Sequence, residues 1–180
     1  MKLFISTLLA ALTALSCYGQ GQVVFANKVG TAVDAPVILL NGNPMTGPGP
    51  TWSAQLYLVG AQNSLTPLTP TSTFHRAGSG AAAIADRYWV AQTVDVPVQP
   101  GTEATFRVRI WQTSSGSFDQ ALLWLRAESA DFTVFVGGGI LPPSNLTTLK
   151  GFSPPIDPEP STIAIGVMGA AVLLLGRRGR

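Results

Sequence analysis

The sequence predicts an all-β domain built as an antiparallel β-sandwich, and three observations lead to that fold class. The 180 residues include 19 glycines and 14 prolines, a share of about 18% against roughly 12% in average proteins, so turns are expected to be frequent. Several short apolar runs alternate with polar residues at the period of two that strands require. No strand-like run alternates with a helical pattern, which argues against a parallel sheet with crossover helices.

The segment 104–112, ATFRVRIWQ, alternates most regularly. Successive side chains of a strand point to opposite faces, so its residues divide into two sets. One set is expected to face the core: Phe106, Val108 and Ile110. The other set is expected to face outward: Thr105, Arg107, Arg109 and Trp111. Similar patterns predict further strands at 22–27, 53–60, 92–98 and 130–139.

Three other segments leave the secondary structure open. Segment 64–74 is expected to be a loop or an edge strand, because prolines cannot donate to a central ladder. Segment 78–90 favours a loop followed by a strand, with a helical turn at 81–85 as the alternative. Segment 117–127 is either a short helix or a strand. The strand count does not separate an immunoglobulin-like from a jelly-roll-like sandwich, and the Cys–Trp–Cys core of antibody domains is absent.

The first 19 residues have the layout of a secretory signal peptide. Lys2 provides the positive start, residues 3–15 form an uncharged and largely apolar run, and small residues follow. Candidate cleavage positions follow Ser16, Gly19 and Gly21, of which Gly19 is preferred. An alternative uses Cys17, because ALSC faintly resembles the site at which a cysteine is lipidated. Either route predicts export across the inner membrane.

Charge and cysteine content exclude several classes of function. Four of the eleven basic residues are Lys2 and the arginines at 177, 178 and 180, so residues 3–176 hold seven basic and nine acidic residues, a formal charge of −2. Such a domain has no basic stripe for a nucleic-acid partner. Cys17 and His75 are the only cysteine and histidine of the chain. No thiolate or zinc-type metal site, disulfide or cofactor is therefore expected.

The C-terminal segment 158–180 has three parts. Pro158, Glu159 and Pro160 come first, and residues 161–176 follow as sixteen positions without a charge. As a helix this run would be about 24 Å long, a marginal span for a hydrocarbon core about 30 Å thick. A basic cluster ends the chain: Arg177, Arg178 and Arg180. These arginines would remain cytoplasmic and act as a membrane stop signal.

This three-part segment resembles the PEP-CTERM sorting signal of exported bacterial proteins. Pro158, Glu159 and Pro160 match its motif, and the terminal arginines match its basic end. The resemblance covers about 23 of the 180 residues. It implies recognition by an exosortase, a membrane-embedded cysteine protease or transpeptidase, with transient anchoring through residues 161–176. Cleavage near the motif would leave the domain at the cell surface or outside the cell, in association with exopolysaccharide or biofilm.

Candidate chemistry in the middle of the chain is sparse. A catalytic triad would have to use His75, with Ser79 and Asp86, but no nucleophile-elbow motif accompanies them. Asp119, Glu128 and Asp131 form the nearest carboxylate cluster for glycoside hydrolysis. Trp89 and Trp111 are the candidate surfaces for stacking on a glycan. No other residue pattern points to catalysis, so a non-enzymatic protein is expected.

The resulting organisation has four parts. A signal peptide occupies 1–19, a β-sandwich domain 20–141, a proline-rich linker 142–157 and the sorting signal 158–180. Within the linker, the segment 146–152 is an alternative final strand. The expected function is that of an exported surface or matrix protein sorted by an exosortase. The alternatives are a carbohydrate-binding module and a secreted polysaccharide hydrolase.

Overall fold

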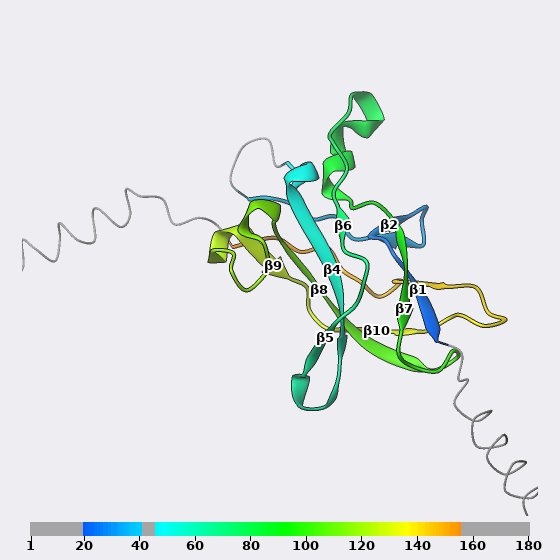
Figure 1. The fold of residues 1–180 in the computed structure, drawn as a ribbon. Helices are drawn as coiled ribbons and strands as arrows, with labels where there is room; N and C mark the ends of the chain where they lie inside the picture. The colour runs from blue at the N-terminus through cyan, green and yellow to red at the C-terminus, as the bar shows by residue number, and fades with distance from the viewer. Residues whose placement is uncertain (1–19, 41–45, 156–180) are drawn as a thin grey trace, which may run out of the picture.

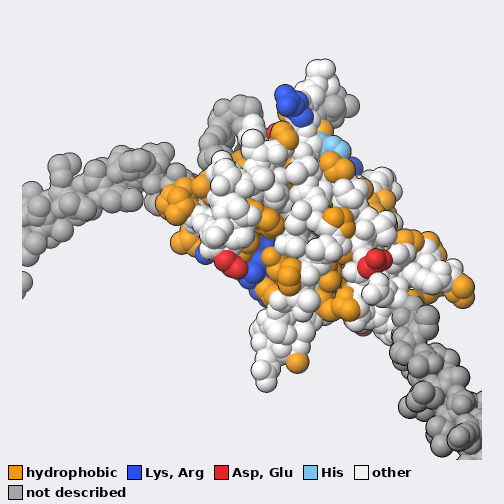
Figure 2. Space-filling view, viewed as in Figure 1, with side chains coloured by type: hydrophobic (Ala, Val, Ile, Leu, Met, Phe, Trp, Pro, Cys, Tyr) orange, Lys and Arg blue, Asp and Glu red, His pale blue; other side chains and the backbone are white. Residues whose placement is uncertain are grey.

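A computed structural model describes residues 20–40 and 46–155, and its strands form mainly antiparallel sheets (Figure 1). Within these residues the remaining regular structure consists of short 3₁₀ helices, and no helix is long and apolar enough to span a membrane. The expected signal peptide and the apolar run 161–176 lie outside the described residues. Charged side chains are few on the face shown in Figure 2, in keeping with a charged fraction of 11%.

The larger sheet is formed by six antiparallel strands. Its central pair joins β4 to β8 along seven residue positions, from Trp52 opposite Gln112 to Leu58 opposite Phe106. The other strands extend this pair on both sides. The bounds are β4 (Trp52–Val59), β5 (Leu65–Pro67), β6 (Ser72–Thr73), β8 (Glu103–Gln112), β9 (Arg126–Glu128) and β10 (Phe132–Phe135).

A second sheet has three strands in the order β11-β1-β7. β1 (Gly21–Phe25) pairs antiparallel with β7 (Gln92–Val96) and parallel with β11 (Ser144–Asn145). A small antiparallel pair, β2 (Lys28–Val29) and β3 (Val33–Asp34), follows β1.

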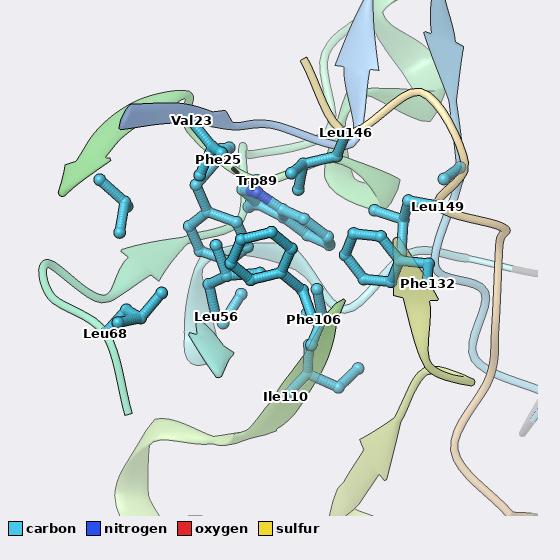
Figure 3. Close-up of a cluster of buried hydrophobic side chains, with 14 of the residues drawn as sticks. Val23, Phe25, Leu56, Leu68, Trp89, Phe106, Ile110, Phe132, Leu146 and Leu149 are labelled. Atoms are coloured by element: carbon cyan, nitrogen blue, oxygen red, sulfur yellow. Dashed lines mark hydrogen bonds between the residues drawn. The ribbon is translucent and has the colours of Figure 1, made fainter. Parts of the chain in front are cut away.

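Both larger sheets contribute to one buried apolar cluster (Figure 3). β1 supplies Val23 and Phe25, and the larger sheet supplies Leu56, Phe106 and Phe132 among others. The alternation predicted for 104–112 is confirmed on its inner side, because Phe106, Val108 and Ile110 are fully buried. Burial of such side chains from water is the main driving force for the pairing of the two sheets.

Trp89 lies at the centre of this cluster and is held by polar contacts. Its indole Nε1 donates to the carbonyl of Phe25 at 3.2 Å, and its ring packs against the rings of Phe25 and Phe74. Its backbone amide donates to Oδ1 of Asn27 at 3.0 Å. The same Asn27 side chain donates to the carbonyls of Ala35 at 2.9 Å and Arg87 at 3.0 Å. Asn27 is itself fully buried, so its amide is satisfied entirely by protein groups.

The open segments resolve in different ways. Residues 64–74 form the edge strands β5 and β6, one of the two expected outcomes. In 78–90 the favoured loop was wrong, because the backbone forms the 3₁₀ helix η3 (Gly80–Arg87) before Trp89 makes an isolated bridge to Phe74. Segment 117–127 contains both η5 (Leu123–Leu125) and β9. The remaining 3₁₀ helices are η1 (Gly49–Thr51), η2 (Ala61–Asn63) and η4 (Thr113–Ser115).

The expected linker at 142–157 is largely part of the domain, which corrects the boundary at residue 141. β11 pairs with β1, and Leu146 and Leu149 are buried in the main cluster. Phe152 bridges Val37 and packs against the same cluster. This segment is therefore not a free tether, because its residues pack against the domain. The packed domain extends at least to residue 152.

We expect Leu146→Ala to lower the free energy of unfolding by about 2–5 kcal/mol, the usual cost of removing a fully buried leucine side chain. Leu146 has 0% of its surface exposed. Thr147→Ala, at the exposed neighbouring position, is the matched control and should change stability by less than about 0.5 kcal/mol. Urea denaturation measures both. Equal stability of the two variants would show that this segment does not belong to the core.

Candidate functional site

The outer face of the larger sheet carries a cluster of charged and aromatic side chains. The alternation of β8 directs Arg107 and Arg109 to the side opposite its buried residues. β9 and β10 both pair with β8. Between them the backbone amide of Val108 donates to the Ser129 hydroxyl at 3.0 Å. Residues 129–131 connect β9 to β10 beside β8. As a result, the carboxylates of Glu128 and Asp131 lie next to the arginines of β8.

Arg107 and Asp131 form a bidentate ion pair. Nε of Arg107 donates to Oδ1 at 2.6 Å, and Nη2 donates to Oδ2 at 3.0 Å. The hydrogen bond from Arg107 lowers the pKa of Asp131 below its usual value, and the same contact raises the pKa of Arg107. Two parallel charge-assisted bonds of this kind fix the orientation of both groups. Asp131 is therefore an ionised partner of Arg107.

Arg109 is enclosed by two aromatic rings and a carboxylate. Its guanidinium carbon lies 4.3 Å from the ring centroid of Phe118 and 5.1 Å from that of Tyr57. Its Nε donates to Oε2 of Glu128 at 3.1 Å. A more distant pairing at 3.9 Å joins it to Asp119. A planar cation stacked on aromatic faces gains both electrostatic attraction and contact area.

Arg126 is a second cation over the Phe118 ring. Its guanidinium carbon is 5.0 Å from the ring centroid, and Nη1 donates to the carbonyls of Phe118 at 3.0 Å and Asp119 at 3.4 Å. Among the described residues, no carboxylate forms an ion pair with it. Within the described part of the chain, the hydrogen-bond partners of the Arg126 guanidinium are therefore backbone carbonyls.

These side chains border an open groove of about 430 Å³. Its walls come from β8, the segment 118–123, β9 and the last described residue: Arg109, Phe118, Asp119, Leu123, Arg126, Ala127, Glu128 and Pro155. The groove thus combines two arginines, two carboxylates and an aromatic ring with apolar positions at its edge. Such a surface can hydrogen-bond hydroxyl and anionic groups of a ligand while packing against its carbon framework.

The expected glycan-stacking residues do not lie on this surface. Trp89 is only 2% exposed because it is the centre of the main core. Trp111 is on the outer face of β8, as the alternation predicts, but it is only 6% exposed. The segment after β8 folds back over it and forms a second apolar cluster with Phe118, Ala121 and Leu125. A covered indole has no free face for a sugar ring, so the stacking role assigned to these two residues is wrong.

The three carboxylates considered for glycoside hydrolysis lie close together, and each of them forms an ion pair with an arginine. Asp131 and Glu128 pair with Arg107, and Glu128 and Asp119 pair with Arg109. A glycosidase of the usual kind needs one carboxyl group whose pKa is raised so that it can donate a proton. Asp131 has the opposite shift. The arrangement is that of an ion-pair network, which the sequence patterns of the separate strands did not reveal.

The other candidate residues have separate surroundings. His75 is exposed, whereas the buried Asp86 accepts a hydrogen bond from the backbone amide of Gly47 at 2.9 Å. In the ranges 20–40 and 46–155, no group of three or more metal-ligating side chains is close enough to hold an ion. The sorting motif Pro158–Pro160 and the arginines 177, 178 and 180 lie outside the described residues.

Comparison with protein-family models, with curated proteins and with solved structures gives no match for this chain. Its function is therefore argued from its own residues.

We expect the Arg107–Asp131 pair to make stability depend on pH in a defined direction. The pKa of Asp131 is lowered in the folded state, so the contribution of the pair is complete above the unfolded value of about 3.9 and disappears as pH falls through the folded value. Because the pair is solvent-exposed, Asp131→Asn should cost about 1 kcal/mol or less at pH 6.

The free energies of unfolding of wild type and Asp131→Asn should approach each other as pH falls below 4. Glu103→Gln is the control, since Glu103 belongs to β8, the strand of Arg107, and has no guanidinium partner among the described residues. A difference between wild type and Asp131→Asn that persists unchanged in acid would contradict the ion-pair assignment. Chemical denaturation at a series of pH values measures the effect.

Proposed function

We propose that this chain is an exported, non-enzymatic protein of the cell surface or extracellular matrix, sorted by an exosortase. The observation that carries the proposal is the order of Pro158-Glu159-Pro160, an uncharged run at 161–176 and a terminal arginine cluster. Prolines on both sides of Glu159 would favour an extended backbone there, which suits a protease cleft. The apolar run would anchor the chain, and the arginines would stop its transfer.

The proposed architecture is a β-sandwich of the two larger sheets, flanked by a signal peptide at 1–19 and a transmembrane helix at 161–176. Support for the sandwich comes from the single apolar cluster to which both sheets contribute. The described chain begins at β1 and ends at the opposite end of the molecule, beside β9 (Figure 1). Processing at both termini would therefore act at separate ends of the packed domain.

Intact mass of the protein recovered from its native host tests the sorting proposal. We expect loss of both terminal segments, with a C-terminal cut close to residues 158–160 that depends on the candidate exosortase gene. Glu159→Gln should reduce that cut, whereas Glu128→Gln, in the folded domain, should leave it unchanged. A mature protein that retains Arg180 in the presence of the exosortase would contradict the proposal.

The groove beside Phe118 favours a second role, binding of exopolysaccharide by the displayed domain. It presents charged hydrogen-bonding groups around an aromatic ring at the surface. Arg126 is its most available donor, because its partners among the described residues are backbone carbonyls. The groove would replace the two buried tryptophans as the glycan-contact surface. The carboxylates paired with arginine support binding over the alternative of polysaccharide hydrolysis.

We expect Arg126→Ala to weaken binding to purified exopolysaccharide of the host about ten-fold, the effect of losing roughly one charged hydrogen bond. Arg76→Ala is the control, since Arg76 is exposed and is not among the groove residues. Co-sedimentation of the protein with the polysaccharide measures both. Equal retention of the two variants would rule out the groove as the binding site.

A further inference from the structure

We propose that exposed apolar side chains around η5 rest on the lipid surface while the C-terminal segment anchors the chain. This inference builds on the proposed anchoring function and adds the face of the domain that meets the membrane. We define the apolar rim as Leu40, Leu122, Leu123 and Trp124. Leu122 is 53% exposed, Leu123 is 65% exposed and Leu40 is 44% exposed.

The apolar rim surrounds the place where the described chain ends. Pro155 lines the main groove together with Leu123. Pro155 also lines a second, smaller hollow of about 180 Å³ together with Leu40 and Trp124. Figure 2 shows hydrophobic side chains gathered at this end of the molecule, at the left of the view. Leu40, Leu123 and Trp124 therefore lie next to the last described residue, where the C-terminal segment begins.

The packing of residues 144–152 makes the remaining tether short. A free linker from residue 142 to residue 160 would reach about 65 Å when extended. Because Leu146, Leu149 and Phe152 pack into the domain, only residues 156–160 separate Pro155 from the apolar run that starts at Ser161. Five residues span at most about 18 Å. The lipid headgroup layer is itself about 5–8 Å thick on each side.

A domain held this close has its η5 end directed at the bilayer. Leucine side chains that would otherwise face water then gain free energy by entering the boundary between headgroups and acyl chains. Tryptophan is enriched at that same boundary, because its ring is apolar and its indole N–H is polar. The occupant that these observations favour is thus a lipid surface rather than a second protein. Release by the exosortase would return the apolar rim to water.

Spin labels on the full-length chain test this inference directly. In a Cys17→Ser background, Leu123→Cys carries the label in the apolar rim, and Ile140→Cys carries the control label. Ile140 is fully exposed, and its loop adjoins β1 through the hydrogen bonds between Gln22 and Gly137, at the other end of the molecule. Both variants replace an exposed apolar residue, so neither should disturb the fold.

The labelled chains are reconstituted in vesicles of phosphatidylethanolamine and phosphatidylglycerol at a ratio of about three to one, a composition that includes an anionic lipid. Relaxation by oxygen, which concentrates in lipid, and by a water-soluble nickel chelate then reports depth. We expect the L123C label to gain oxygen exposure and lose nickel exposure relative to the I140C label. Leu122→Gln in the L123C chain should partly reverse that shift.

Each alternative outcome has a distinct signature. If the chain resists carbonate extraction but both labels remain in water, the docking inference is wrong and the anchor stands. If the L123C label is shielded from both relaxing agents and immobile, a protein surface such as a second copy covers the apolar rim, and lipid docking is overturned. If carbonate removes the chain from the vesicles, the proposed anchor fails, and the docking inference fails with it.

Discussion

The buried amide of Asn27 is the interaction on which the arrangement of this domain depends. It lies just beyond β1 and bonds to three backbone groups, of Ala35, Arg87 and Trp89, from two distant segments. Leaving such groups unpaired in the interior would cost about 1–3 kcal/mol each. Their pairing holds η3 against the end of β1 and brings the Trp89 ring between Phe25 and Phe74. A polar residue thus determines how the apolar core is assembled.

The outer face of the larger sheet is organised by ion pairs and cation–aromatic contacts rather than by burial of apolar side chains. β8 alternates between apolar side chains that fill the core and arginines that face away from it. The arginines are held by carboxylates from the same edge of the sheet and by the rings of Tyr57 and Phe118. The segment that carries Phe118 also covers Trp111. One fold-back of the chain therefore buries an indole, stacks two guanidiniums and forms the wall of the groove.

The C-terminal part of the domain links the fold to the proposed sorting step. Residues 144–152 lie in the expected proline-rich linker, for which a final strand at 146–152 was the alternative. They add a parallel strand at 144–145 to β1 and two leucines to the core. The distance between the packed domain and the apolar run is therefore short, because only residues 156–160 lie between them. A flexible linker over the whole segment would allow a wide range of distances. The position of the domain relative to its proposed anchor is consequently a property of tertiary packing.

The sequence by itself determined the all-β class, the inward face of β8, and the outward direction of Arg107 and Arg109, because the period of two is a local property of a strand. It also contains the proposed sorting signal, which depends on residue order alone. Only the tertiary structure decided that Trp111 is covered and that residues 144–152 join the core. It likewise decided that Glu128 and Asp131 form ion pairs with Arg107 and Arg109. Each of these depends on which distant segment packs against a given face, and local periodicity contains no information about that choice.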